Sequence, residues 1–484
     1  MSSASSPGSR CRNLTMNTAS AALSSSNPSA LKPAGRRPPG PKSVRPFFGV
    51  LTPFRKDPPG FLLRNARQYG DLVYLPLARQ HAYLVNRPEW IRDIFVTHQS
   101  NFVKSRMLER AKVLLGEGLL TSEGEFHTRQ RRLVQPAFHR DRMAHYGQEM
   151  VACAARVRDR WQPGSVFDIG TEMPRLTLAI VGRTLFSADV SSDAEGIGRA
   201  MTEVFSQFDR LLMPFSEWLQ KLPLPSVRRF ERARATLDKV IYGLIAERRA
   251  SGRDAGDLLS MLLLAQDEDR GRMTDRQVRD EALTLLIAGH ETTANALIWS
   301  WYLLSQNPEA EARMHAELAE VLGGRLPAFE DVTKLPYTTG VFSEALRLYP
   351  PAWAIGRRAK QDYGIGEYTI PAGSILLMSP WVSHRDPRWF PEPEKFNPDR
   401  WLSGETEKLP KFAYFPFGGG ARVCIGERFA WTEGVLVLAT LAQRWKLRLV
   451  PGQKVETRAA ITLRSRHAMN MIAEPAGASA SNPA

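Results

Sequence analysis

A long helical segment is the clearest feature in the pattern of apolar and polar residues. It runs from about Thr274 to Gln306, which is about 50 Å at the rise of an α-helix and enough to cross a domain. Thr274 together with Gln277 is typical of a capping box, and Asn307-Pro308 supplies a stop signal. The centre of the segment, residues 283–289, is apolar on nearly every side, which predicts a buried helix.

The remaining pattern is also mainly helical, with short strands towards the amino end. Residues 72–75 and 81–85 have the composition of strands, Pro-rich loops dominate residues 380–416, and an apolar helix is predicted from about Glu427 to Trp445. No GxGxxG motif follows a strand, so a dinucleotide-binding domain is not indicated. The pattern therefore predicts a fold that is mainly α with small β-sheets.

Composition and charge narrow the class of protein. The chain has 484 residues, 43% of them apolar, and its cysteines (Cys11, Cys153 and Cys424) form no CxxC pair, so neither a disulfide framework nor a zinc cluster is indicated. Residues 1–56 carry nine Lys or Arg and no acid until Asp57, which leaves 56 basic and 50 acidic residues in the remainder. A mildly basic body is compatible with an acidic protein partner, and no nucleic-acid-binding motif is present.

The two ends of the chain differ from its middle. Residues 1–37 are rich in Ser, Ala and Pro and are expected to be a disordered basic tail, as are residues 474–484; residues 38–473 are expected to form one folded body. The first residues contain no apolar run long enough for a transmembrane anchor or secretory signal, so the expected compartment is the cytoplasm. An organelle transit peptide is the alternative, and Met16 is a second candidate start.

The candidate chemistry lies near the carboxyl end, in residues 417–426. A lone cysteine is usually a small buried hydrophobe, but here three glycines let the backbone approach a flat group closely, and an apolar helix follows. Cys424 is therefore expected near a helix amino end, where free N–H groups favour a thiolate. Arg422 could pair with a carboxylate on a ligand. A cysteine thiolate is one recognised axial ligand of haem.

The segment matches FxxGxRxCxG at every fixed position, namely Phe417, Gly420, Arg422, Cys424 and Gly426. It resembles the haem-binding loop of the cytochrome P-450 family, the haem-thiolate monooxygenases, and the resemblance extends from about residue 38 to residue 471. It implies a single large haem-thiolate monooxygenase fold that binds haem b. It also implies Cys424 as the axial iron ligand, with Phe417 and Arg422 in the cofactor site.

Other signatures of the family occur in the expected order. Within Ala288–Thr293, the resemblance implies that Glu291 and Thr292 deliver protons to iron-bound dioxygen, while His290 is expected to be a packing residue. A mid-helix Thr more commonly bonds to the carbonyl one turn earlier. Gly289 costs about 1 kcal/mol in a helix relative to Ala, so a local opening of the helix is expected beside a pocket.

Two further sets of polar residues take roles from the resemblance. Glu344 and Arg347 form an ExxR pair, which with Arg400 is expected to be a buried structural triad. The haem propionates are expected to be bound by three residues, His127, Arg131 and Arg357, although Arg358 is an alternative to Arg357. Without the resemblance, the Arg-rich helix that carries His127 and Arg131 would be taken as a solvated basic face.

The implied activity is hydroxylation of a hydrophobic substrate with dioxygen, and fatty acids and terpenoids are equally compatible with the sequence. By analogy, recognition falls in four segments: residues 107–120, 205–230, 352–356 and 459–463. They offer apolar side chains, which are more often ordinary core residues: Met213, Phe215, Trp218, Trp353 and Ile461.

Electrons are expected to come from a separate ferredoxin or flavodoxin with its reductase, because only 60 residues follow Cys424. The predicted docking face lies near Arg422 and residues 127–132. Three alternatives remain open. They are a haem-thiolate peroxygenase or isomerase that needs no reductase, a non-enzymatic haem sensor or carrier, and a globular scaffold without haem.

Overall fold

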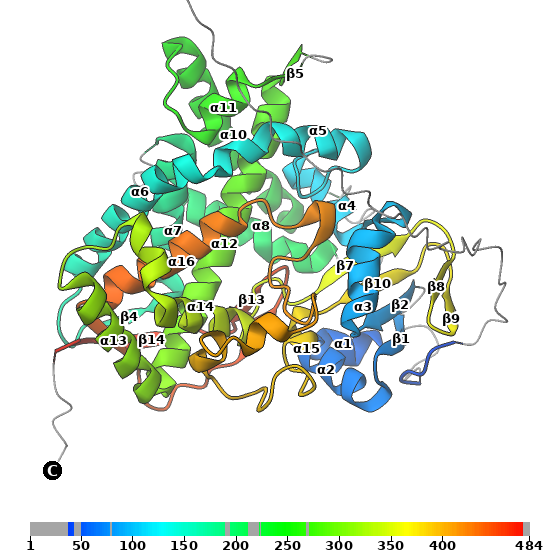
Figure 1. Ribbon diagram of the computed structural model, residues 1–484. Coiled ribbons are helices and arrows are strands. Elements are labelled where there is room, and N and C mark those ends of the chain that lie inside the picture. Colours follow the sequence, from blue (N-terminus) through cyan, green and yellow to red (C-terminus); the bar gives the residue numbers. More distant parts are fainter. Residues whose placement is uncertain are drawn as a thin grey trace, which may run out of the picture.

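The computed structural model describes residues 37–42, 50–77, 80–188, 194–211, 222, 224–267 and 271–477. Helices form most of the body, the larger sheet lies on one side of it, and β4 and β14 of a smaller sheet lie on the other (Figure 1). This arrangement confirms the predicted mainly α fold with small β-sheets.

The helices are as follows: α1 Leu51–Lys56, α2 Pro58–Tyr69, α3 Pro88–Arg92, α4 Arg106–Leu115, α5 Gly124–Val134, α6 Arg140–Arg160, α7 Ile169–Phe186, α8 Ala194–Leu211, α10 Pro225–Ser251, α11 Leu258–Leu264, α12 Asp275–Gln306, α13 Pro308–Leu322, α14 Pro336–Leu348, α15 Pro380–Ser383 and α16 Glu427–Ala442. Short helical turns join them: the π-helical η1 Asp93–Thr97, and the 3-10 turns η2 Gln99–Asn101, η3 Gln135–Phe138, η4 Phe329–Lys334, η5 Pro398–Trp401, η6 Glu405–Lys408 and η7 Gly420–Arg422.

The strands form one larger sheet and several small ones. The larger sheet has the order β1 Leu72–Leu77, β2 Gln80–Val85, β10 Ile375–Met378, β7 Ile355–Ala359 and β3 Phe102–Lys104, in which only β10 and β2 run parallel. A second sheet contains β11 Trp445–Leu449, β14 Asn470–Pro475 and β4 Val166–Asp168. The hairpins are β5 Gln266–Asp267 with β6 Gly271–Arg272, β8 Tyr363–Ile365 with β9 Tyr368–Ile370, and β12 Thr457–Ala459 with β13 Leu463–Ser465.

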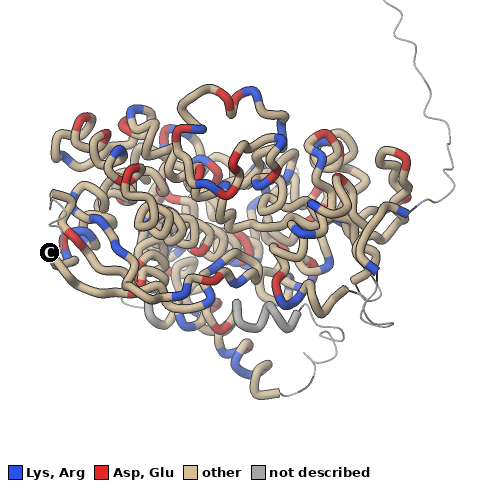
Figure 2. Tube along the Cα trace, turned by 90° about the horizontal axis from the view of Figure 1, so that it is seen from below, with Lys and Arg blue, Asp and Glu red and all other residues tan. Residues whose placement is uncertain are grey.

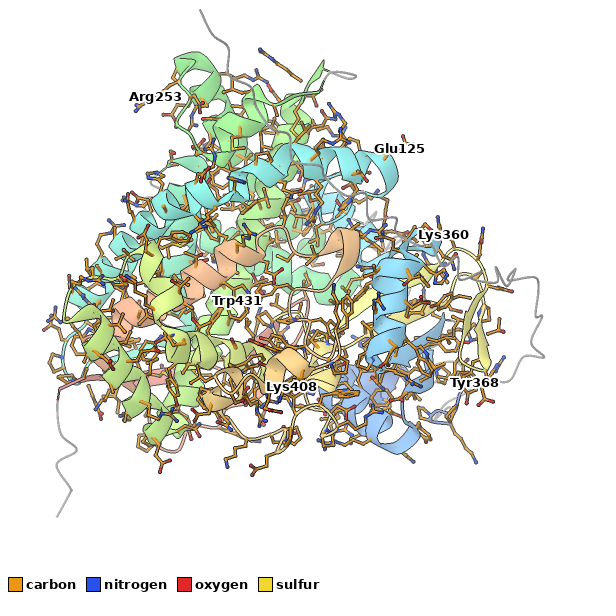
Figure 3. The ribbon with its side chains drawn as sticks, viewed as in Figure 1. Glu125, Arg253, Lys360, Tyr368, Lys408 and Trp431 are labelled. Atoms are coloured by element: carbon orange, nitrogen blue, oxygen red, sulfur yellow. The ribbon has the colours of Figure 1, made fainter. Side chains whose placement is uncertain are left out.

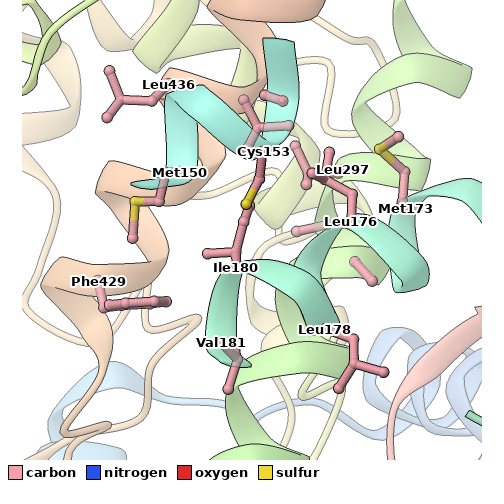
Figure 4. Packing of buried hydrophobic residues seen from close by; sticks show 14 of the residues in the cluster. Met150, Cys153, Met173, Leu176, Leu178, Ile180, Val181, Leu297, Phe429 and Leu436 are labelled. Atoms are coloured by element: carbon pink, nitrogen blue, oxygen red, sulfur yellow. The ribbon is translucent and has the colours of Figure 1, made fainter. Parts of the chain in front are cut away.

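Helix α12 is the predicted buried helix, and it crosses the centre of the body (Figure 1). The capping box is present: Thr274 N–H donates to Gln277 Oε1 at 2.9 Å, and Gln277 N–H donates to Thr274 Oγ1 at 3.3 Å. The helix packs against α7, α10, α14 and α16. Figure 4 shows the core beside it, where Met150 and Cys153 of α6 meet Ile180 of α7, Leu297 of α12 and Leu436 of α16.

Two boundaries differ from the sequence expectations. Helix α16 ends at Ala442, short of the predicted Trp445, because Trp445 begins β11 and pairs with Pro475. Glu474 and Pro475 therefore belong to β14, two residues past the predicted end of the folded body. Residues 1–36 and 478–484 lie outside the described residues. In the part of the chain that is described, no helix is long and apolar enough to cross a membrane.

Candidate functional site

Cys424 lies between η7 and the first turn of α16. Its backbone N–H donates to Phe417 O at 3.0 Å, which closes the loop that carries it. Gly418 and Gly420 have φ values of +74° and +69°, a region that favours glycine. A Cβ on Gly420 would lie only 1.8 Å from Phe95 O, so this glycine lets η1 pack against the cysteine loop. The Phe417 ring contacts Trp431 of α16, with ring centroids 5.7 Å apart. Figure 3 labels Trp431 on this helix.

The protonation of Cys424 is not what the helix amino end alone predicts. Burial raises the pKa of the Cys424 thiol to about 11, and the backbone N–H of Gly426 only partly opposes this. The backbone N–H of Gly426 thus favours the thiolate, in the direction expected from the helix end, while desolvation acts against it. A cation bound at the sulfur would favour the thiolate in addition.

A cluster of basic side chains lies beside the cysteine loop. Burial, and then the positive charges of Lys104, Arg422, Arg131 and Arg357, lower the pKa of His127 to about 4. Arg131 of α5 donates from Nη1 to Val423 O at 2.8 Å and so connects α5 to the residue before the cysteine. The structure therefore brings the three predicted propionate ligands and Arg422 together, with Lys104 as a further member.

Lys104 was not found by the sequence analysis. It ends β3, and its buried ammonium group donates to Leu119 O and Ser122 O, both at 2.7 Å. Burial lowers the pKa of Lys104 to about 7, and the positive charge of Arg422 contributes in the same direction. No motif marks this residue, because a lysine at the end of a short strand is usually exposed.

Arg422 forms an ion pair with Glu123, and its Nη1 donates to Phe102 O at 3.3 Å. Glu123 also accepts the backbone N–H of Lys104 at 2.5 Å. The predicted interaction of Arg422 with a carboxylate is thus made within the protein by Glu123. Glu281 is a second acid whose charge acts on Lys104. The basic groups outnumber these two acids, so the cluster has the charge to bind further carboxylates.

The structure distinguishes the two neighbouring arginines of β7. Arg357 is buried, stacks over the Phe95 ring at 5.1 Å, and has its pKa lowered to about 10, mainly by burial. Arg358 points to the other side of the strand, where it forms an ion pair with Glu109. The alternation of side chains along a strand explains the difference, and it favours Arg357 as the cofactor contact.

The predicted opening of α12 is not present. The helix is continuous from Asp275 to Gln306, and the Thr292 hydroxyl donates to Ala288 O at 2.7 Å. A Cβ on Gly289 would lie 3.4 Å from Val181 of α7, an ordinary contact, so this glycine is not required by a close approach. Burial lowers the pKa of His290 to about 4, which fits the expected neutral packing residue.

Glu291 is buried and bound to the hairpin β12–β13. Its Oε1 accepts from Arg464 Nε at 2.6 Å and from the Thr462 hydroxyl. Its Oε2 has no hydrogen-bond partner among the described residues. Burial raises the pKa of Glu291, and the Arg464 charge opposes that rise. The sequence analysis missed both partners, because they come from a hairpin more than 170 residues further along the chain.

The structural triad is present as predicted. The fully buried Glu344 accepts from Arg347 at 2.8 and 2.7 Å and from Arg400 Nε at 3.2 Å. Trp401 Nε1 also donates to it, at 3.0 Å. Arg347 donates onward to His384 O at 2.8 Å, so the triad joins α14 to the loops that precede the cysteine segment.

The predicted recognition segments are only partly described. Met213, Phe215 and Trp218 lie outside the described residues. Trp353 is half-buried and donates from Nε1 to Ala460 O at 3.0 Å, which connects two of the segments. Ile461 is half-buried and packs against the main core.

The residues around Cys424 fit a haem group. A sulfur ligand, a glycine-containing loop that can approach a flat ring, and an excess of buried basic groups for two propionates occur together. When bound, haem with a thiolate ligand supplies the activation of dioxygen. Comparison with known proteins agrees with this assignment, since the family model described as Cytochrome P-450 matches residues 38–467.

Several relatives share most of their length with this chain. Cyclooctatin synthase of Streptomyces melanosporofaciens is 43% identical over 85% of this chain and 90% of its own. Cyclooctat-9-en-7-ol 5-monooxygenase of the same organism is 40% identical over the same shares. The solved structure of a retinoic-acid-bound cyanobacterial CYP120A1 superimposes with a TM-score of 0.82 at 26% identity, over 91% of this chain and all of that one.

Proposed function

Because the chain belongs to the cytochrome P-450 family, we propose that its hydrophobic substrate is a terpenoid. The enzyme is a monooxygenase, and its reaction converts RH, dioxygen, two electrons and two protons into ROH and water. This class excludes the scaffold and the non-enzymatic carrier as the main function. The relatives that act as monooxygenases also favour it over a peroxygenase or isomerase.

We assign separate roles in cofactor binding and catalysis to residues of this chain. Cys424 is the proposed axial ligand of haem b, with Phe417 beside the thiolate loop. Four basic residues, His127, Arg131, Arg357 and Arg422, are proposed to bind the propionates, with Lys104 as a fifth. Glu291 and Thr292 are the proposed catalytic pair, which moves protons towards bound dioxygen from the centre of α12. The separate electron donor is proposed to be a ferredoxin or flavodoxin with its reductase.

The absence of charge in two recognition segments is the observation that favours a terpenoid over a fatty acid. Residues 352–356 and 459–463 contain no charged side chain. In residues 107–120, Lys112 forms an ion pair with Glu117, and Glu109 is paired with Arg358. A fatty acid carboxylate that reached residues 352–356 or 459–463 would lose hydration without gaining a cationic partner from those two segments, whereas a terpenoid needs apolar contacts and few polar ones.

A spectral titration tests the proposal. Purified ferric protein, first shown to form the thiolate-type carbon monoxide complex when reduced, is titrated with cyclic terpenes, terpene alcohols and fatty acids of similar size. A saturable low-spin to high-spin shift with the terpenoids, and none with the fatty acids, is the expected result. A shift with fatty acids alone would overturn the substrate class. Cys424→Ala should abolish the thiolate spectrum, and Cys153→Ala should retain it.

A further inference from the structure

Glu291, the proposed proton donor, makes no hydrogen bond to Thr292 in the structure. The Glu291 carboxylate is hydrogen-bonded to Thr462 and Arg464 of the hairpin β12–β13, while the Thr292 hydroxyl is bonded to Ala288 O. Of the two oxygens of the Glu291 carboxylate, Oε2 has no hydrogen-bond partner among the described residues. The carboxylate is therefore held by one oxygen, and the other is available.

The hairpin that holds the carboxylate is itself fixed to the surrounding elements. Trp299 of α12 donates from Nε1 to Leu463 O at 3.2 Å, and Asn295 donates to the Thr462 hydroxyl at 3.4 Å. On its other side, Leu463 N–H donates to Pro351 O at 3.0 Å. Arg464 and Thr462 are thus presented to Glu291 from a well-anchored position.

The ion pair runs from the interior towards the surface. The Glu291 side chain is 8% exposed and the Arg464 side chain is 29% exposed. Arg464 therefore reaches solvent while its guanidinium group contacts a buried acid. A buried carboxylate without such a partner would take up a proton and keep it, because desolvation disfavours the charged form.

We propose that Arg464 is a positioning residue for proton supply. Together with Thr462, it holds Glu291 as a carboxylate against the hairpin β12–β13, until Glu291 takes up a proton and carries it towards Thr292. This proposal rests on the proposed monooxygenase function. It assigns the hairpin a role in catalysis, in addition to the substrate recognition expected of residues 459–463. Proton uptake then occurs at Glu291 beside Arg464, and transfer to Thr292 requires the carboxyl group to leave the hairpin.

In the described part of the chain, Arg464 is the charged group that contacts the Glu291 carboxylate. His290 precedes Glu291 on α12, and burial lowers its pKa to about 4, so it is neutral near pH 7. Glu433 of α16 lies against Thr293, and burial raises the pKa of its carboxyl group well above the usual range. Of these three groups, Arg464 is the one that bonds to Glu291 directly.

Three variants test the role of the Arg464 charge. Arg464→Met removes it, Arg464→Lys keeps it, and Arg458→Met removes a charge from the residue that pairs with Arg464 across the same hairpin. The first readout is the infrared band of a protonated carboxyl group in the holoenzyme at neutral pH. It is assigned to Glu291 by its loss in a Glu291→Gln background. We expect this band in Arg464→Met and its absence in wild type, Arg464→Lys and Arg458→Met.

The second readout is the product formed per electron pair, measured with its solvent isotope effect. Arg464→Met is expected to lower the product per electron pair about tenfold, with release of hydrogen peroxide and a larger isotope effect, as loss of a proton-transfer group does. Thr462→Val, which keeps the shape of its side chain, should give a smaller change in the same direction. Arg464→Lys and Arg458→Met should stay close to wild type.

The outcomes separate this proposal from the proposed function. If Glu291→Gln lowers the yield of product while Arg464→Met leaves both readouts unchanged, the positioning role is wrong and the proposed function stands. If the infrared band appears in Arg464→Met but neither Glu291→Gln nor Thr292→Ala changes the yield, the contact is confirmed and the catalytic pair is overturned.

Discussion

The hydroxyl of Thr292 has two uses that compete. In the structure it donates to Ala288 O at 2.7 Å, which is what a mid-helix threonine ordinarily does. In the proposed mechanism the same hydroxyl passes a proton to bound dioxygen. The back-bond alone has little energetic value for the helix, so loss of the hydroxyl should affect the reaction more than the fold.

Thr292→Ala is therefore expected to keep stability within about 1 kcal/mol of wild type and to divert most electrons into hydrogen peroxide. The matched control is Thr184→Ala on α7, because Thr184 makes the same kind of bond, to Ile180 O at 2.7 Å. Product, peroxide and reductant consumption are measured together. Equal yields in the two variants would contradict a catalytic hydroxyl at Thr292.

Residues close together in the sequence were easier to assign than residues that meet only in the fold. Cys424, Phe417 and Arg422 lie in one motif, and their placement follows from the glycines around them. Lys104 lies on β3 and Arg464 on β13, far in the sequence from Cys424 and Glu291 respectively. No motif around either residue indicates that it belongs to the site. The sequence also indicates the helix amino end near Cys424, but not the desolvation that opposes its effect on the thiol.

At the scale of elements, the long helix α12 could be predicted almost to the residue. Its capping box, its apolar centre and its Asn-Pro stop are all local signals. The end of α16 could not be predicted in this way, because residues 443–445 contain neither the Gly nor the Pro that would signal a helix stop. The pairing of β11 with β14 decides where the helix stops, and that pairing depends on residues 470–475.

The packing of α13 against β11 leads to a prediction about acid stability. Burial, and then the charges of Lys446 and Arg448, lower the pKa of His315 to about 4. Between about pH 6.5 and pH 4 the unfolded chain binds a proton that the folded protein does not, so this residue makes stability fall as the pH falls. At pH 5 the expected loss from His315 is about 1 to 2 kcal/mol.

His315→Gln should therefore lose less stability than wild type between pH 7 and pH 5. His139→Gln is the control, because His139 is exposed. Urea unfolding of the holoenzyme at both pH values gives the two free-energy differences. An identical loss in wild type and His315→Gln would show that His315 is not held neutral by its surroundings.

At the scale of the whole molecule, the charge is mixed rather than concentrated. Basic and acidic residues alternate along the trace of the body (Figure 2), in agreement with the near balance outside residues 1–56. Composition could therefore indicate a mildly basic protein but not where a partner binds. The structure adds that Arg131 of α5 contacts the cysteine loop at Val423 O, and that the next residue on this helix, Arg132, is exposed.

An acidic electron donor is proposed to dock on this face, near Arg422 and residues 127–132, because a short path to the thiolate loop favours electron transfer. Arg132→Glu should slow reduction by a ferredoxin about threefold to tenfold at low salt, with the difference shrinking as salt screens the charges. Arg253→Glu, which reverses an exposed charge in the turn after α10, should leave the rate unchanged. Haem content and the carbon monoxide spectrum, measured in both variants, separate docking from cofactor loss. Equal rates for both variants at low salt would place the electron donor on another face, since steering by charge is strongest under that condition.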